Sequence, residues 1–88
     1  MIKNCEVIAA TTLIEQPVPA VALTVWSFYK SKGVEERIVL SLEKARALAK
    51  MAQVESVEDL VGRAFRLEFK DAELISILHI VSKATISI

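Results

Sequence analysis

The sequence predicts an α+β domain: a curled antiparallel sheet of five or six strands, with one main helix between the third and fourth strands. Three observations lead to this prediction. Apolar and polar residues alternate in several segments before residue 41 and again after residue 62, which is typical of strands. Between these regions the apolar residues repeat with the period of a helix that packs on a sheet. The order three strands, helix, two strands also occurs in OB-type barrels, so a closed barrel is the alternative architecture.

Three strands are expected in the N-terminal half. The segment Asn4 to Glu15 is β-branched and apolar, and residues 16–19 end it with two prolines, which cannot donate to a strand ladder. Ala20 to Tyr29 forms the second strand. Residues 30–33 form a hairpin turn in which glycine supplies a positive φ, and Glu36 to Leu40 is the third strand. The second strand has two unlike faces, with Val21, Leu23 and Val25 on one and Trp26 and Phe28 on the other.

The main helix follows directly. Ser41 can cap it, and Glu43 lies in its positive first turn. The helical pattern ends near Gln53 or Val54. Alanines on the apolar stripe would allow the helix to approach a sheet closely. That stripe contains Leu42, Ala45, Leu48, Ala49 and Ala52.

A one-turn helix and a further strand come next. Ser56 and Asp59 have the spacing of a capping box, and Gly62 ends the short helix. The segment Arg63 to Lys70 alternates cleanly, so one face of this strand is in the core and the other is in water. We expect the core face to pack against the helix stripe. Its residues are Phe65, Leu67 and Phe69.

The last strand, Leu74 to Val81, is apolar on both faces, and residues 82–88 carry one charge and no proline or glycine. Such an edge invites pairing with another chain. We therefore expect the C-terminal region to form a self-association surface, most simply around a two-fold axis. The alternatives are that residues 83–88 fold back as an internal sixth strand or fray. The residues expected at the self-association surface are Leu78, Ile80, Ile86 and Ile88.

Composition limits the classes of function. The 88 residues suit one domain, 1–88, and 53% of them are hydrophobic, which favours a homo-oligomer, with a dimer as the first expectation. Eleven basic residues balance eleven acidic ones, whereas nucleic-acid-binding domains normally have a basic surplus. The longest uncharged run, Gln16 to Tyr29, is shorter than the ~20 residues of a spanning helix. We expect no membrane association and a cytoplasmic location.

No residue pattern indicates catalysis. His79 is the only histidine, and it lacks the local carboxylate or nucleophile that a general base needs. We interpret it as a structural histidine, although a functional role stays open. Cys5, the only cysteine, alternates with apolar residues and is interpreted as a small buried hydrophobe. No catalytic, cofactor-binding or metal-binding residues are predicted.

One group of residues could contact a partner. Aromatic side chains interleaved with cations hold single-stranded nucleic acid by stacking and phosphate contacts. Glu35 and Glu36 lie in the same region and would oppose a phosphate backbone. The favoured interpretation is core aromatic residues beside solvated turn charges, with a nucleic-acid or partner surface as the alternative. The group contains Trp26, Phe28, Lys30, Lys32 and Arg37.

Part of the second half resembles a pattern in small phage and prophage accessory proteins. The matching residues are Glu58 to Arg63, then Arg66, then Ile77 to Val81, with Leu78 where glycine is usual. The resemblance implies a phage-encoded accessory role in the host cytoplasm rather than a metabolic one. Proteins of this kind act by stoichiometric binding, for example as anti-CRISPR inhibitors or as single-strand binders.

Two hypotheses follow. The first is a non-enzymatic, self-associating protein that binds a host protein or defence complex and inhibits it. The second is an OB-like protein that binds single-stranded nucleic acid. A nucleic-acid binder should bind labelled oligonucleotides with a steep dependence on salt concentration.

Overall fold

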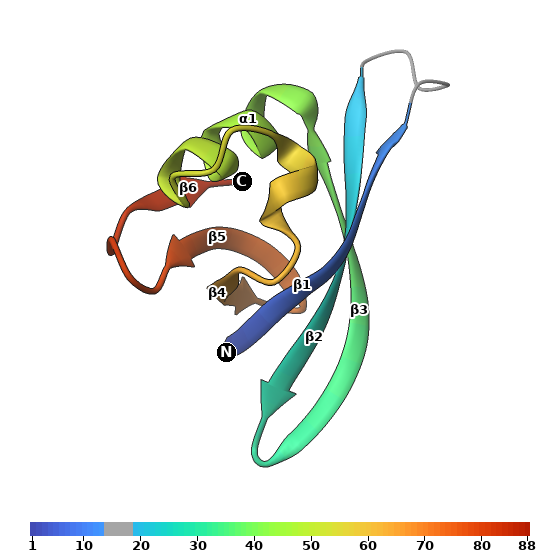
Figure 1. Ribbon diagram of the computed structural model, residues 1–88. Coiled ribbons are helices and arrows are strands. Elements are labelled where there is room, and N and C mark those ends of the chain that lie inside the picture. The colour runs from blue at the N-terminus through green and yellow to red at the C-terminus, as the bar shows by residue number, and fades with distance from the viewer. Residues whose placement is uncertain (14–18) are drawn as a thin grey trace.

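The computed structural model describes residues 1–13 and 19–88, with only the backbone of residue 29. It confirms the predicted α+β class (Figure 1). Most of the predicted strand break at 16–19 lies outside the described residues. The elements in chain order are β1 (Ile2–Leu13), β2 (Ala20–Tyr29), β3 (Lys32–Ser41), α1 (Leu42–Met51), the 3₁₀ helix η1 (Val57–Leu60), β4 (Ala64–Lys70), β5 (Glu73–His79) and β6 (Thr85–Ser87).

The described strands form one antiparallel sheet in the order β3-β2-β1-β4-β5-β6. β1 joins its two halves, because Cys5 is paired with Ser27 of β2 on one side and with Phe65 of β4 on the other. The sheet curls around α1 and η1, so that α1 contacts β2 and β3 as well as β6 (Figure 1). β3 and β6 remain edges. The alternative of a closed barrel is therefore wrong.

The β2–β3 turn differs from the prediction. Lys30 and Ser31 occupy the left-handed region, with φ values of 50° and 65°, as the two central residues of a type I′ hairpin do. Gly33 has no positive φ and lies within β3, paired with Phe28. The strand therefore starts four residues earlier than the sequence indicated, at Lys32.

The helices begin where their caps predict. Ser41 Oγ accepts a hydrogen bond from the Lys44 backbone N–H at 3.2 Å. The helix α1 ends at Met51, slightly before the predicted end, because Gln53 turns into the left-handed region at φ 59°. In the following short helix, the Asp59 carboxylate accepts hydrogen bonds from the backbone N–H and the hydroxyl of Ser56.

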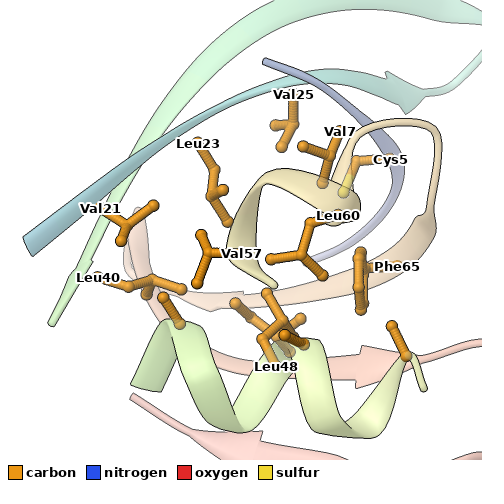
Figure 2. Packing of buried hydrophobic residues seen from close by; sticks show 14 of the residues in the cluster. Cys5, Val7, Val21, Leu23, Val25, Leu40, Leu48, Val57, Leu60 and Phe65 are labelled. Atoms are coloured by element: carbon orange, nitrogen blue, oxygen red, sulfur yellow. The ribbon is translucent and has the colours of Figure 1, made fainter. Parts of the chain in front are cut away.

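The short helix η1 has a role that its sequence did not show. Gly62, at φ +88°, turns the chain back, and its N–H donates to the Val7 carbonyl of β1 at 2.8 Å. This bond anchors η1 inside the curl of the sheet. Figure 2 shows Val57 and Leu60 between side chains of the sheet and Leu48 of α1. The short helix therefore fills the space that α1 leaves in the core.

The predicted β4 face and the helix stripe contribute to the same hydrophobic core. Phe65 and Leu67 are buried in the same core as α1, while Phe69 and Leu42 are half-buried at its margin. The buried members of the helix stripe are Ala45, Leu48, Ala49 and Ala52.

The observed β5 departs from the simple alternation expected for it. The register shifts between Glu68 and Phe69 of β4, as at a β-bulge. Leu74 consequently packs against the core on the same side as Ile77, although alternation placed the two residues on opposite faces. Val81 is exposed in the turn that follows, outside the strand.

The C-terminal segment pairs with its own chain, as in the alternative considered above. Ile86 of β6 is paired with Ile77 of β5 and packs against the core. Leu78 and Ile80 are half-buried and Ile88 is exposed. Self-association through this segment stays a prediction.

Candidate functional site

The outer face of the sheet carries an exposed aromatic pair on β2. Trp26 is 40% exposed and Phe28 is 51% exposed, while the residues that alternate with them, Val25 and Ser27, are buried. The two unlike faces predicted for this strand are confirmed. The favoured interpretation of Trp26 and Phe28 as core aromatics is wrong, because the helices occupy the other side of the sheet.

Contacts with each other and with β3 hold the two aromatic rings in place. The rings of Trp26 and Phe28 pack edge to face, with centroids 6.1 Å apart and planes at 78°. The indole also lies against Gly33 of the neighbouring strand, where a Cβ atom would come within 2.4 Å of Trp26 Cζ2. A glycine inside β3 thus makes room for the indole. No local sequence signal distinguished this role from that of a turn glycine.

The partners across the strands define the surroundings of the pair. Glu6 of β1 and Glu35 of β3 lie opposite Trp26. Asn4 lies opposite Phe28, and its Oδ1 accepts a hydrogen bond from Arg66 Nε at 3.2 Å. We call this surface the aromatic face; its residues are Asn4, Glu6, Trp26, Phe28, Gly33 and Glu35.

The predicted cations are exposed but do not surround the indole. Arg37 is paired with Thr24, one outward position beyond the Trp26–Glu35 pair. Lys30 lies in the hairpin turn, and Lys32 begins β3 at the end of the ribbon. The nearest cross-strand charges to Trp26 are therefore negative.

Glu36 lies on the opposite face from Glu35. Its carboxylate accepts hydrogen bonds of 2.7 Å from Lys3 Nζ and from Ser27 Oγ, and Lys3 lies 5.0 Å from the centre of the Phe69 ring. Burial acts to raise the pKa of Glu36, but the bonds from Lys3 and Ser27 outweigh it and lower that pKa. The contacts among Lys3, Ser27 and Glu36 connect β1, β2 and β3. They lie on the inner face, so these residues are not part of the aromatic face.

The contacts of His79 are those of a structural residue. It is buried at the end of β5, its ring lies 5.4 Å from that of Phe65, and its Nδ1 is 2.9 Å from Ser82 Oγ. Ser82 Oγ also accepts a bond from the Ala84 N–H at 3.2 Å. The Ser82 backbone N–H donates to Nδ1 at 3.4 Å, so Nδ1 acts as an acceptor and the Ser82 hydroxyl can donate its own proton to it. His79 thus organises the turn into β6.

Cys5 is buried, as predicted. Burial raises the pKa of its thiol to about 12, against a smaller opposing effect of a backbone hydrogen bond from Phe65. A thiol with such a pKa has almost no thiolate near neutral pH.

A hollow between α1 and η1 was not anticipated from the sequence. Its charged lining mixes Arg46 and Lys50 with Glu55 and Glu58. Among the described residues, no three His, Cys, Asp or Glu side chains come together in the way metal ligands do. No helix in residues 1–13 or 19–88 has the length and apolarity needed to cross a membrane.

Compared with protein-family models, with curated proteins and with solved structures, the chain gives no match. The aromatic face is therefore the candidate site on structural grounds alone.

Proposed function

We propose that this protein acts without catalysis, by stoichiometric binding of another protein through the aromatic face. The observation that carries the proposal is the exposure of Trp26 and Phe28 on a strand that is paired on both sides. Tryptophan and tyrosine are enriched among the residues that dominate protein interfaces. The edge-to-face packing and the seat on Gly33 limit the rotamer entropy lost on binding.

The charges around the pair favour a protein partner over nucleic acid. Glu6 and Glu35 lie directly opposite Trp26, so a phosphate backbone crossing the indole would meet two carboxylates. A protein surface with basic or amide groups around an apolar pocket would complement this arrangement. The expected partner thus presents an apolar pocket rimmed by lysine or arginine.

The resemblance to phage accessory proteins supports a specific biological role. Such a protein would be made in an infected bacterium and would bind a host protein, with inhibition of a host defence complex, as by anti-CRISPR proteins, as its function. Catalytic residues are not needed for this role, because occupancy of the target surface is sufficient.

A tagged protein purified from its bacterial host after chemical cross-linking tests the proposal. We expect one predominant cross-linked partner in a fixed ratio to the chain. The variant Trp26→Ser/Phe28→Ser should lose it, whereas Val61→Ser, which removes an exposed apolar residue elsewhere, should keep it. Equal capture by both variants would contradict a role for the aromatic face.

The exposed aromatic pair also keeps the second candidate, single-strand binding, open to test. Base stacking on an aromatic ring contributes about 1–3 kcal/mol, and stacking on Trp26 would quench its fluorescence. We expect no quenching and no salt-dependent rise in anisotropy with labelled oligonucleotides. Tight binding that weakens steeply with salt and is lost in Trp26→Ser would replace the first proposal with the second.

A further inference from the structure

The two edges of the sheet differ in how they are protected. β6 is three residues long, and Lys44 Nζ of α1 donates to the Ser87 carbonyl beside it. β3 spans ten residues in regular register with β2. It has no proline or bulge, and within the described residues no strand lies beyond it (Figure 1). A long regular edge is a template for another strand unless charges repel it, and the four charged residues of β3 are of both signs, so a suitably aligned strand can pair with them.

We propose that β3 pairs antiparallel with β3 of a second copy of this chain, around a two-fold axis that passes beside Glu36. In an antiparallel pair related by such an axis, residues whose numbers lie equally far on either side of the central residue stand opposite each other. Glu35 then faces the partner's Arg37, and Arg37 faces the partner's Glu35. All four side chains are exposed on the outer face, so the dimer contains two cross-strand ion pairs.

The apolar residues of β3 are complementary in the same register. Val34 is 48% exposed and would lie opposite the partner's Ile38 on the inner face. Val39 is 55% exposed and would lie opposite the partner's Gly33, beside the indole that rests on that glycine. Two exposed valines of each chain thus gain apolar neighbours.

The charges also select this register over its neighbours. Opposing residues must lie on the same face of the sheet, so the two-fold axis can pass beside a residue but not between two residues. The neighbouring registers are therefore centred on Glu35 and on Arg37. Each of the three registers places one pair of like charges directly opposite each other, but centring on Glu35 or on Arg37 adds no opposite-charge pair, whereas centring on Glu36 adds two. Centring on Glu36 brings two carboxylates together on the inner face, where each is already neutralised by its own Lys3.

The pairing makes one continuous sheet from two chains. A two-fold axis perpendicular to the sheet keeps both aromatic faces on the same side, next to the new junction. A target protein with two equivalent binding sites would then be bound bivalently by the dimer. The dimer itself does not depend on the proposed function, because it rests on the residues of β3.

Charge exchange at two positions tests the proposal. Sedimentation or light scattering over a dilution series should show a dimer of the native chain. Arg37→Glu and Glu35→Arg each place like charges opposite one another twice per dimer. Each should weaken dimerisation by about tenfold or more. Arg46→Glu makes the same change of net charge as Arg37→Glu, on an exposed part of α1, and should leave the dimer intact.

The decisive experiment asks whether exchanging both charges restores dimerisation. The double variant Glu35→Arg/Arg37→Glu should dimerise again, and an equimolar mixture of the two single variants should form a heterodimer although neither does so alone. Circular dichroism checks that each variant is folded. A monomeric native chain would overturn the proposal, as would a dimer that the single substitutions leave unchanged or a loss that the double exchange does not restore.

Discussion

The inner and outer faces of β2 show opposite relations between side-chain size and burial. Val25 and Ser27 are buried on the inner face, whereas the larger Trp26 and Phe28 are exposed on the outer face. The inner volume of the curled sheet is already filled by α1 and η1 (Figure 2), so small side chains fit there best. An aromatic residue in a small domain is therefore not automatically part of its core.

The largest expected effect is at the inner face of β4. Leu67→Ala removes a fully buried side chain and should lower the free energy of unfolding by about 2–5 kcal/mol. Ile2→Ala, which alters an exposed residue paired with the next residue of β4, should change it by less than about 0.5 kcal/mol. Urea unfolding measures both values. Similar losses in the two variants would show that the faces have been assigned incorrectly.

Gly33→Ala tests the seat of the indole on the outer face. The new methyl group would meet Trp26 Cζ2, and overpacking of this kind costs about 1–3 kcal/mol. We expect the lower end of this range, because an exposed ring can move, together with a shift in tryptophan fluorescence. In a Trp26→Ala background the same change should cost nothing, since Gly33 has no positive φ. An equal cost in both backgrounds would exclude contact with the indole as the cause.

The dependence of stability on acid pH tests the role of Glu36, a charged residue on the inner face. Its pKa is lower in the folded state than in the unfolded state, so its contribution is present above the unfolded value. That contribution is lost as the pH falls through the folded value. Glu36→Gln and Lys3→Met should both flatten the decline of stability in acid, measured as Tm against pH. An unchanged decline in Glu36→Gln would contradict this role.

The smallest expected signal is at Cys5. With a thiol pKa of about 12, the folded native chain should remain unlabelled by a thiol reagent at mildly alkaline pH and react fully in denaturant. Moving the thiol by one residue, in Cys5→Ala/Glu6→Cys, transfers it to the outer face and should allow rapid labelling of the folded chain. Rapid labelling of native Cys5 would show that the inner face opens readily.

Residues with local signals were predicted well. Ser41 begins α1 and Ser56 with Asp59 begins η1, because a cap depends only on the next few residues. Gly33 was misplaced, since a glycine before a strand and a glycine beneath a distant indole look alike in sequence. Glu35 was expected near Trp26, but Glu6 was missed, because it reaches Trp26 only through the pairing of β1 with β2.

Local patterns in the sequence predicted the type and order of the elements and the division of β2 into two unlike faces, because periodicity and capping are local properties. Tertiary structure alone decided which of those faces is outside, that the sheet stays open at β3, and that Leu74 joins Ile77 in the core. These outcomes depend on registers between distant strands and on how much of the enclosed volume the two helices occupy. No segment of the chain contains that information alone.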